Sequence, residues 1–467
     1  MLSRKKILIV GSGPSSLAFL KAIFKKQKCE VDLIDSSSYK IFKDQECVFI
    51  DKFAGSRLPI SQKQPDKDLL ISNHFGGFST FWGGTFDDPS EEILNKYHDL
   101  GIDLNDDLKE IDGIIPQINR ADNIQDSNLK SGVIKTGTFD KFTKQGFIVK
   151  DSNIAVSQNT INLKKQNNNK KCNICKGFEW SCKPDTIWNS GLFIRQLIDE
   201  KKINYFENST LISFKEAENK VLCKVNLGNN VVEKKYDKLI IACGPVGTSK
   251  IFLKSKIFEE VIINSSDLLQ IPFIKLFKSY KKQDSFADLF SYIQIVKNMV
   301  YSQIYFFSNQ VLLLSSNTIS FTKLLKFVPN LFLSLSGGIF IYLDTKVSSK
   351  IRYTMTNDKL VSSKIDGDLE KKKAILKVLK KKHLKINILF FPFLKKEYLY
   401  GTSYHLGAQF PISLVSKKFS SDSLGRVGNC KNVHVVDASV LPDVNIGPVT
   451  KLIMANSFRI GKELNKQ

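Results

Sequence analysis

The stretch that decides the fold is residues 6–16, which read KILIVGSGPSS. Its apolar start, Lys6 to Val10, has the β-branched residues of a buried strand, and the glycines that follow indicate a tight turn. From Leu17 to Ile23, apolar residues recur with helical spacing. A second apolar run, Val31 to Ile34, ends at Asp35. The pattern therefore predicts a β-α-β unit with an acidic residue at the end of its second strand.

The turn has the residue types that suit a bound dinucleotide. Gly11 permits the sharp bend, Gly13 lets the main chain approach a pyrophosphate, and the helix that begins near Pro14 directs its dipole at the negative charge. We expect Ser15 to belong to the same phosphate site and Asp35 to accept hydrogen bonds from the ribose hydroxyls of an adenosine. A chance glycine-rich turn is the alternative, and the motif alone does not separate FAD from NAD.

Composition places the chain among ordinary globular proteins. Of its 467 residues, 42% are apolar and 25% are charged, and the net charge is +23. The lysines are spread along the whole length without a helix-turn-helix, zinc-finger or RNP-like motif, so no nucleic-acid partner is predicted. A basic surface would also suit anionic membranes or acidic substrates. Biased base composition of the genome is the simpler explanation, so peripheral membrane contact is not favoured.

The eight cysteines do not form the pattern of a disulfide framework. Cys172, Cys175 and Cys182 make a C-x2-C-x6-C cluster, which raises the hypothesis of a zinc or iron-sulfur site. Because no fourth ligand lies nearby, we expect structural cysteines and no metal. The apolar run from Val328 to Leu343 is interrupted and too short to span a bilayer, and the basic N-terminus leads into the glycine turn. We therefore expect a cytoplasmic protein.

Further elements are predicted downstream. Strands are expected at Val221 to Val225 and at Leu239 to Ala242, and both are candidates to join the first sheet. Between about Phe286 and Thr354 the runs become rich in aromatic and β-branched residues, which predicts an antiparallel sheet in a separate lobe. The stretch from Asp368 to Lys385 is predicted to be a basic helix with a solvated lysine face.

Two glycine-rich segments, 74–84 (HFGGFSTFWGG) and 237–248 (DKLIIACGPVGT), resemble signatures of the glucose-methanol-choline (GMC) oxidoreductase superfamily. In that family the first segment lies along the flavin, and the second is a buried strand that ends in a turn beside the FAD. Main chain without side chains can press against a planar ring system and a diphosphate. A flexible loop and a buried strand with its exit turn are the alternatives. By match, the expected FAD contacts are Gly76, Gly77, Ser79, Trp82, Gly83 and Gly244.

The strongest resemblance is C-terminal, in segment 433–442 (VHVVDASVLP) and in the segment 447–460 that follows. In the GMC family the Asp-Ala-Ser turn contacts the phosphate and ribityl part of the flavin, and the next helix points its N-terminus at the isoalloxazine. By match, Asp437 and Ala438 take the first role, and Gly447, Pro448 and Thr450 lie near the ring. A helix N-terminus stabilises the negative charge of a reduced flavin. The alternative is a buried strand, a turn and an ordinary amphipathic helix.

Segment 401–411 (GTSYHLGAQFP) looks like the family segment that carries the active-site histidine, which makes His405 the candidate base. Alcohol oxidation needs a group that takes the hydroxyl proton while hydride leaves the carbinol carbon for flavin N5, and an imidazole with a pKa near ~6.5 can accept that proton. Many GMC enzymes add a second His or Asn. An ungapped alignment anchored on Asp437 and Ala455 puts Pro448 at that position, so Asn445, slightly upstream, is the candidate substitute.

The sequence thus predicts an α/β fold with a Rossmann-like FAD-binding domain, residues 1–256 and 400–467, and an inserted, mainly antiparallel substrate domain, residues 257–399. The expected activity is oxidation of a CH-OH group in a sugar, polyol or other small-molecule alcohol, with dissociable FAD and an electron acceptor that no motif identifies. Two alternatives stay open. One is a flavin-binding protein without turnover that serves a binding role, and the other is an NAD(P)H-dependent flavoprotein, which would need a second glycine-rich fingerprint.

Overall fold

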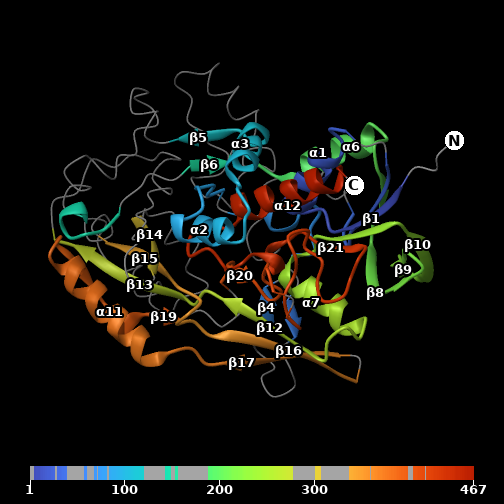
Figure 1. Ribbon diagram of the computed structural model, residues 1–467. Coiled ribbons are helices and arrows are strands. Elements are labelled where there is room, and N and C mark those ends of the chain that lie inside the picture. Colours follow the sequence, from blue (N-terminus) through green and yellow to red (C-terminus); the bar gives the residue numbers. More distant parts are fainter. Residues whose placement is uncertain are drawn as a thin grey trace.

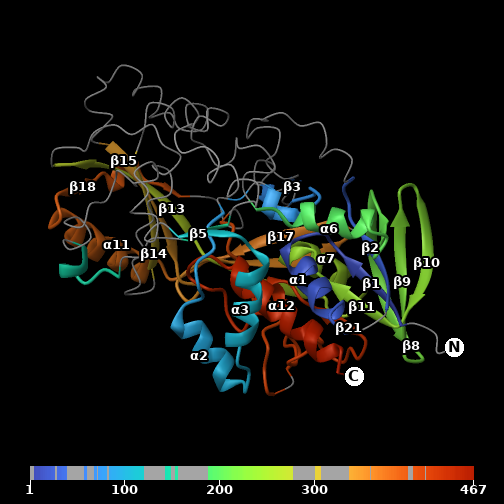
Figure 2. The same cartoon turned by 90° about the horizontal axis from the view of Figure 1, so that it is seen from above.

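The computed structural model describes residues 5–26, 29–38, 57–59, 68–70, 72–80, 82, 84–119, 142–148, 153–155, 188–276, 300–306, 336–357, 359–397, 403–415 and 417–466. Within these residues a parallel sheet covered by helices lies beside antiparallel sheets that carry one long helix (Figure 1). The same division is visible from above (Figure 2). The chain is therefore a mixed α/β protein, which confirms the predicted class in its coarse form.

The parallel sheet has the strand order β21-β11-β1-β2-β7. β1 pairs in parallel with both β2 and β11, and α1 connects β1 to β2, so the predicted β-α-β unit is confirmed. Because both faces of such a sheet are covered, β1 and β11 are apolar after their first residue, whereas β2 also carries the buried Asp32. The strands are β1 (Lys6–Val10), β2 (Glu30–Ile34), β7 (Asn204–Phe206), β11 (Lys238–Ile241) and β21 (Val433–Val435).

Two helices from opposite ends of the chain pack side by side over this sheet. α1 (Pro14–Ile23) and α12 (Thr450–Leu464) approach so closely that a Cβ on Gly461 would lie 2.9 Å from the Cβ of Ala22. This contact brings the last segment of the chain onto the first β-α-β unit (Figure 1). The remaining helices near the sheet are α2 (Glu91–Asp99), α3 (Asn105–Ile114), α6 (Ser190–Asp199) and α7 (Gly244–Lys254).

A separate antiparallel sheet of three strands stands beside the parallel one. It contains β8 (Ser209–Ala217), β9 (Lys220–Leu227) and β10 (Asn230–Tyr236). The predicted strand at Leu239 joins the parallel sheet as β11, whereas the prediction that residues 221–225 could join it is wrong, because they lie in β9 and pair with β8 and β10. A tight turn with positive φ at Glu218 and Asn219 makes the local pairing of β8 with β9 possible.

The second lobe is antiparallel, as predicted from its aromatic and β-branched runs. One sheet has the order β17-β16-β12-β20 and the other has β14-β15-β13-β18, with β19 paired to β13. The predicted basic helix is confirmed as α11 (Leu369–Leu384), capped by the Asp368 carboxylate. The lobe's strands are β12 (Glu260–Ser265), β13 (Leu268–Lys275), β14 (Val300–Phe306), β15 (Ser336–Leu343), β16 (Lys350–Thr356), β17 (Lys359–Ile365), β18 (Ile388–Phe390), β19 (Lys396–Glu397) and β20 (Leu406–Gly407).

Residues 142–148 pack on the antiparallel lobe, where Phe142 and Phe147 join its core, and a later part of the chain enters that lobe at β12. β12 follows the parallel-sheet part, β20 leads back to it, and the two strands are antiparallel neighbours. The boundaries at residues 257 and 399 stay a prediction. In the described residues no helix is long and apolar enough to cross a membrane. The short elements are β3 (Arg57–Pro59), β4 (Asp68–Leu70), β5 (Gln117–Asn119), β6 (Asn153–Ala155), η3 (Gly77–Thr80), η6 (Pro392–Leu394) and η7 (Ala438–Val440).

Candidate functional site

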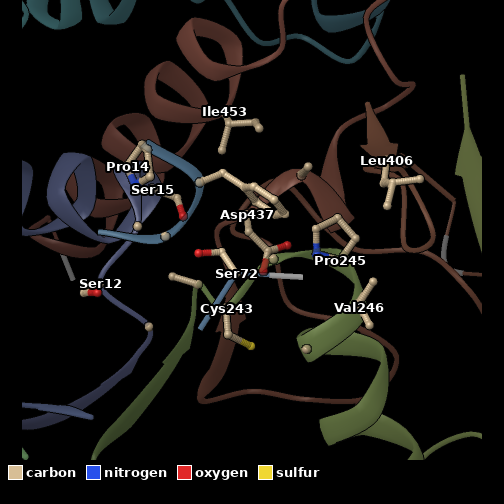
Figure 3. A pocket seen from close by; sticks show the side chains of 18 of the residues that line it. Ser12, Pro14, Ser15, Ser72, Cys243, Pro245, Val246, Leu406, Asp437 and Ile453 are labelled. Carbon is tan, nitrogen blue, oxygen red and sulfur yellow. The ribbon is translucent and has the colours of Figure 1, made fainter. Parts of the chain in front are cut away.

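A cavity of about 500 Å³ lies where the carboxyl ends of the parallel strands face the antiparallel lobe. Its wall joins segments that are far apart in the sequence. Ser12 follows β1, Cys243 follows β11, and Asp437 follows β21, and Figure 3 shows Ser12 on one side of the cavity and Leu406 on the opposite side. Ligands of open parallel sheets bind at this edge, so the cavity is the candidate site.

The turn after β1 brings main chain to the cavity without side chains in the way. Gly11 has φ +99°, and a Cβ there would lie 2.7 Å from the carbonyl oxygen of Ala242. A Cβ on Gly13 would meet no heavy atom within 4 Å, so open space lies beside it. On its other side Gly77, with φ +59°, packs against Gly13, since its Cβ would lie 3.3 Å from the Gly13 Cα. A bare backbone beside open space suits a phosphate group.

Asp35 holds this turn in place. Its Oδ2 accepts hydrogen bonds from the Ser12 amide at 2.8 Å and the Ser12 hydroxyl at 2.6 Å, and its Oδ1 accepts the same pair from Ser37 at 2.9 and 2.6 Å. The Gly76 amide in turn donates to the Ser12 hydroxyl at 2.8 Å. Burial raises the pKa of the Asp35 carboxyl, while these hydrogen bonds oppose the rise. Four donors already occupy the carboxylate, so its expected role toward ribose hydroxyls stays a prediction.

Asp437 repeats the same arrangement at the end of β21. Its Oδ1 accepts the Ser439 amide at 2.9 Å and the Ser439 hydroxyl, and its Oδ2 accepts the Thr248 hydroxyl at 2.6 Å. The Gly244 amide also donates to this carboxylate. Burial raises the pKa of Asp437, and the hydrogen bonds again oppose the shift. The carboxylate therefore ties α7 to η7 (Ala438–Val440), the turn that follows β21.

The first turns of α1 and α12 line the cavity and lack the groups that usually satisfy helix N-termini. Neither has a side-chain cap, and neither has an acidic residue in its first turn. α7, whose first turn also lines the cavity, has no side-chain cap at its N-cap residue either, but its Gly244 amide donates to Asp437. By contrast, α2, α6 and α11 are capped by Ser90, Asn189 and Asp368. Free amides and a positive dipole end facing a cavity favour negative charge in it. This arrangement fits the phosphates and the electron-rich ring edge of a flavin dinucleotide.

His405 lies on the Leu406 side of the cavity. Its imidazole stacks on the ring of Tyr342 in β15, with centroids 4.5 Å apart and planes inclined by 24°. The Nδ1 atom is buried and has no hydrogen-bond partner among the described residues. Burial lowers the pKa of His405 to about 4. The ring is thus neutral at pH 7 and can accept a proton from a ligand in the cavity.

Most of the predicted site residues in the described part of the chain meet in this cavity, but Gly76, Asn445 and Gly447 do not. The main chain of Gly76 lies behind the wall, bonded to Ser12, and Gly83 lies outside the described residues. Asn445 and Gly447 are also outside the lining. The predicted residues that line the cavity are Gly11, Gly13, Ser15, Asp35, Gly77, Ser79, Trp82, Gly244, His405, Asp437, Ala438, Pro448 and Thr450.

The side-chain amide of Asn445 makes its hydrogen bonds within the protein. Its Nδ2 donates to the Pro448 carbonyl at 3.0 Å, and its Oδ1 accepts from the Ser90 hydroxyl at 3.0 Å. These contacts hold the turn before α12, so the geometry gives Asn445 a positioning role and leaves its predicted role beside the base untested. Sequence reasoning missed Tyr342, because no local motif marks a residue that reaches the site from another element. Thr248 lies in the recognised segment 237–248, but its bond to Asp437 depends on the folded arrangement.

The other histidines show how His405 differs. His383 and His434 are also buried, and burial lowers the pKa of each to about 4. Their Nδ1 atoms, however, bond to the carbonyls of Leu379 and Leu424 at 2.8 and 3.0 Å, inside the core. Neither ring lines the cavity. Of the buried histidines in the described part of the chain, only His405 faces the cavity.

The cysteine cluster of residues 172, 175 and 182 lies outside the described residues. Within those that the structure does describe, no group of three or more His, Cys, Asp or Glu side chains could hold a metal ion. Cys243 lines the cavity, but burial raises the pKa of its thiol, which keeps it protonated.

Comparisons with known proteins show what this architecture shares. The chain is similar to the crystal structure of pyridoxine 4-oxidase from Mesorbium loti, with a TM-score of 0.62 over 99% of this chain and 100% of that chain. The likeness is one of fold. Sequence identity is 11%, and no family model and no curated protein matches the chain. The match supports the predicted arrangement of a parallel sheet with antiparallel sheets.

Proposed function

We propose that this chain binds FAD and oxidises the CH-OH group of a small-molecule alcohol, as a protein of the GMC type. The observation that carries the proposal is one cavity that joins two uncapped helix N-termini to a buried, neutral histidine. The similarity in fold to pyridoxine 4-oxidase supports an oxidase-type reaction. Pyridoxine is itself an alcohol, so both lines favour the same reaction class.

The residues of the chain fit the two chemically different parts of FAD. Open space beside Gly13 and the free first turn of α1 suit the pyrophosphate. Pro448 and Thr450, at the start of α12, would meet the flavin ring, where the helix dipole favours negative charge. FAD supplies a hydride acceptor when it is bound.

His405 takes the proton in this proposal. The hydroxyl proton of the alcohol passes to the imidazole, the hydride leaves the same carbinol carbon, and a carbonyl forms, so two electrons and two hydrogens leave the substrate. A histidine with a pKa of about 4 is in its basic form at pH 7. Tyr342, stacked on its face, fixes the ring plane. Asn445 holds the turn of residues 447–450 that carries the flavin-facing main chain.

Anaerobic bleaching of the FAD-loaded protein by a panel of sugars, polyols, sterols and simple alcohols tests this proposal. One class should bleach the parent protein, and His405→Ala should lower the rate by about 10²- to 10⁴-fold. His383→Gln is the matched control, because it changes a buried histidine that does not face the cavity. If FAD binds but stays oxidised with every alcohol, the flavin-binding role without turnover replaces the enzyme.

A further inference from the structure

Two aromatic side chains with large accessible surfaces meet at the reacting side of the cavity. Phe78 is 38% exposed and Tyr404 is 48% exposed, and both line the cavity. Their rings touch edge to face, with centroids 6.2 Å apart and planes at 88°. Tyr404 directly precedes His405. Accessible aromatic surface that lines a cavity points to an apolar ligand.

The exposed area belongs to the cavity wall. Burial of the hydroxyl end raises the pKa of Tyr404, while the side chain as a whole keeps accessible surface. The residues that precede the two rings in the chain are packed. Gly77 lies against Gly13, and the Ser403 hydroxyl is 3.3 Å from that of Ser265. The two rings therefore extend from packed segments and contact each other.

Tyr342 adds a third ring from the antiparallel lobe. It stacks on His405 and is supported by a small apolar cluster with Leu268 and Tyr301. The base consequently stands among aromatic side chains that come from three different segments: η3, β15 and the segment before β20. Flat faces near a base suit a substrate whose reacting carbon is attached to a flat ring.

The aromatic rings and the imidazole that line the cavity are neutral side chains. Burial is the cause of the shifts in the pKa of Tyr404 and of His405. The charged residues that line the cavity are Asp35, Asp437, Lys250 and Lys254, and both acids are bonded to protein donors. A sugar presents many hydroxyls that each need a partner, and an apolar wall would leave several of them unpaired.

We propose that the substrate is a neutral alcohol whose CH-OH carbon is attached to an aromatic ring, held between Phe78, Tyr404 and Tyr342. This inference rests on the proposed alcohol oxidation and narrows its substrate class away from sugars and polyols.

Binding and turnover are measured separately in the test, both on the FAD-loaded protein. Calorimetry with benzamide and cyclohexanecarboxamide compares a flat and a puckered ring of the same size, neither of which has a carbinol group. Benzamide should bind at least ten-fold more tightly, and Phe78→Leu should remove most of that preference. Phe393→Leu is the control, because Phe393 is 78% exposed and does not line the cavity. Equal affinities in the parent, or a preference that Phe78→Leu leaves intact, would overturn the inference.

Turnover then separates the inference from the proposed function. Benzyl alcohol should bleach the bound flavin, and its rate at low concentration should fall about ten-fold in Tyr404→Leu and recover in Tyr404→Phe. If glucose or a polyol bleaches the flavin and benzyl alcohol does not, the alcohol oxidation stands and the aromatic substrate is wrong. If benzamide is preferred but no alcohol bleaches the flavin, the ring site stands and the oxidation is wrong.

Discussion

The part of the cavity wall around Ser12 is main chain with short polar side chains, whereas the part around His405 includes the aromatic rings of Tyr342 and Tyr404. The first side obtains its shape from glycines and from a buried carboxylate at a strand end, as Gly11 and Asp35 illustrate. The second side depends on rings such as Phe78 and Tyr342 that meet only in the folded protein. In the proposed function, the first side would hold the cofactor and the second side would hold the substrate.

The largest effect is expected from Gly11→Val. The new Cβ would lie 2.7 Å from the Ala242 carbonyl oxygen, and its φ of +99° strains any β-branched residue. We expect a loss of about 3 kcal/mol or more in the free energy of unfolding, together with loss of FAD. Urea denaturation and flavin content measure both. Gly228→Ala is the control, because it also has positive φ but meets open space; equal costs for the two variants would contradict the steric account.

Acid should destabilise the protein through its buried histidines. His383, His405 and His434 have folded-state pKa values of about 4, below the ordinary 6.5. Unfolding then takes up protons between these values, so stability is full above pH 6.5 and is lost as pH falls toward 4. Each histidine can contribute up to about 3 kcal/mol. Denaturation at pH 7, 5.5 and 4.5 measures the slope, which His383→Phe should reduce; an unchanged slope would show that His383 is not buried in its neutral form.

Thr248→Val should have an intermediate effect. It removes the hydroxyl that donates to Asp437 while keeping nearly the same shape, and it leaves a buried carboxylate oxygen without that donor. The free energy of unfolding should fall by about 1 to 3 kcal/mol. FAD should also bind more weakly, because α7 and η7 lose one of the hydrogen bonds that join them. Thermal unfolding and a flavin titration measure it. Ser249→Ala, on the same helix, is the comparison, since its hydroxyl bonds to the Pro245 carbonyl.

The smallest effect is expected from Tyr342→Leu. Without the stacked ring, the His405 imidazole can rotate, so flavin reduction should slow by about three- to ten-fold, equivalent to about 1 kcal/mol. FAD affinity should stay the same, because Tyr342 contacts the base and not the phosphate turn. Tyr342→Phe keeps the ring and should restore the rate. A drop in FAD affinity equal to the drop in rate would show that Tyr342 supports the fold rather than the base.

More of the cavity wall around Ser12 than of the wall around His405 could be predicted from the sequence. Gly11, Gly13 and Asp35 lie within one local β-α-β pattern, so their shared place could be predicted from spacing. His405 was found through a resemblance that spans few residues. Phe78 stood within a recognised segment, yet its contact with Tyr404 depends on packing between segments more than 300 residues apart. The prediction that Val221 to Val225 could join the first sheet is wrong. These residues pair with their sequence neighbours β8 and β10, and an apolar run alone does not show which strands it will pair with.

The most direct test of the account is FAD binding to a Gly13→Ala variant. A Cβ at this position meets no protein atom within 4 Å, so the added methyl group would enter the space assigned to the pyrophosphate without a clash in the protein itself. The account predicts that the parent chain binds one FAD, and that the variant has the same denaturation curve without ligand but binds FAD at least ten-fold more weakly. A folded variant that binds FAD as well as the parent, or a folded parent that binds none, would contradict it.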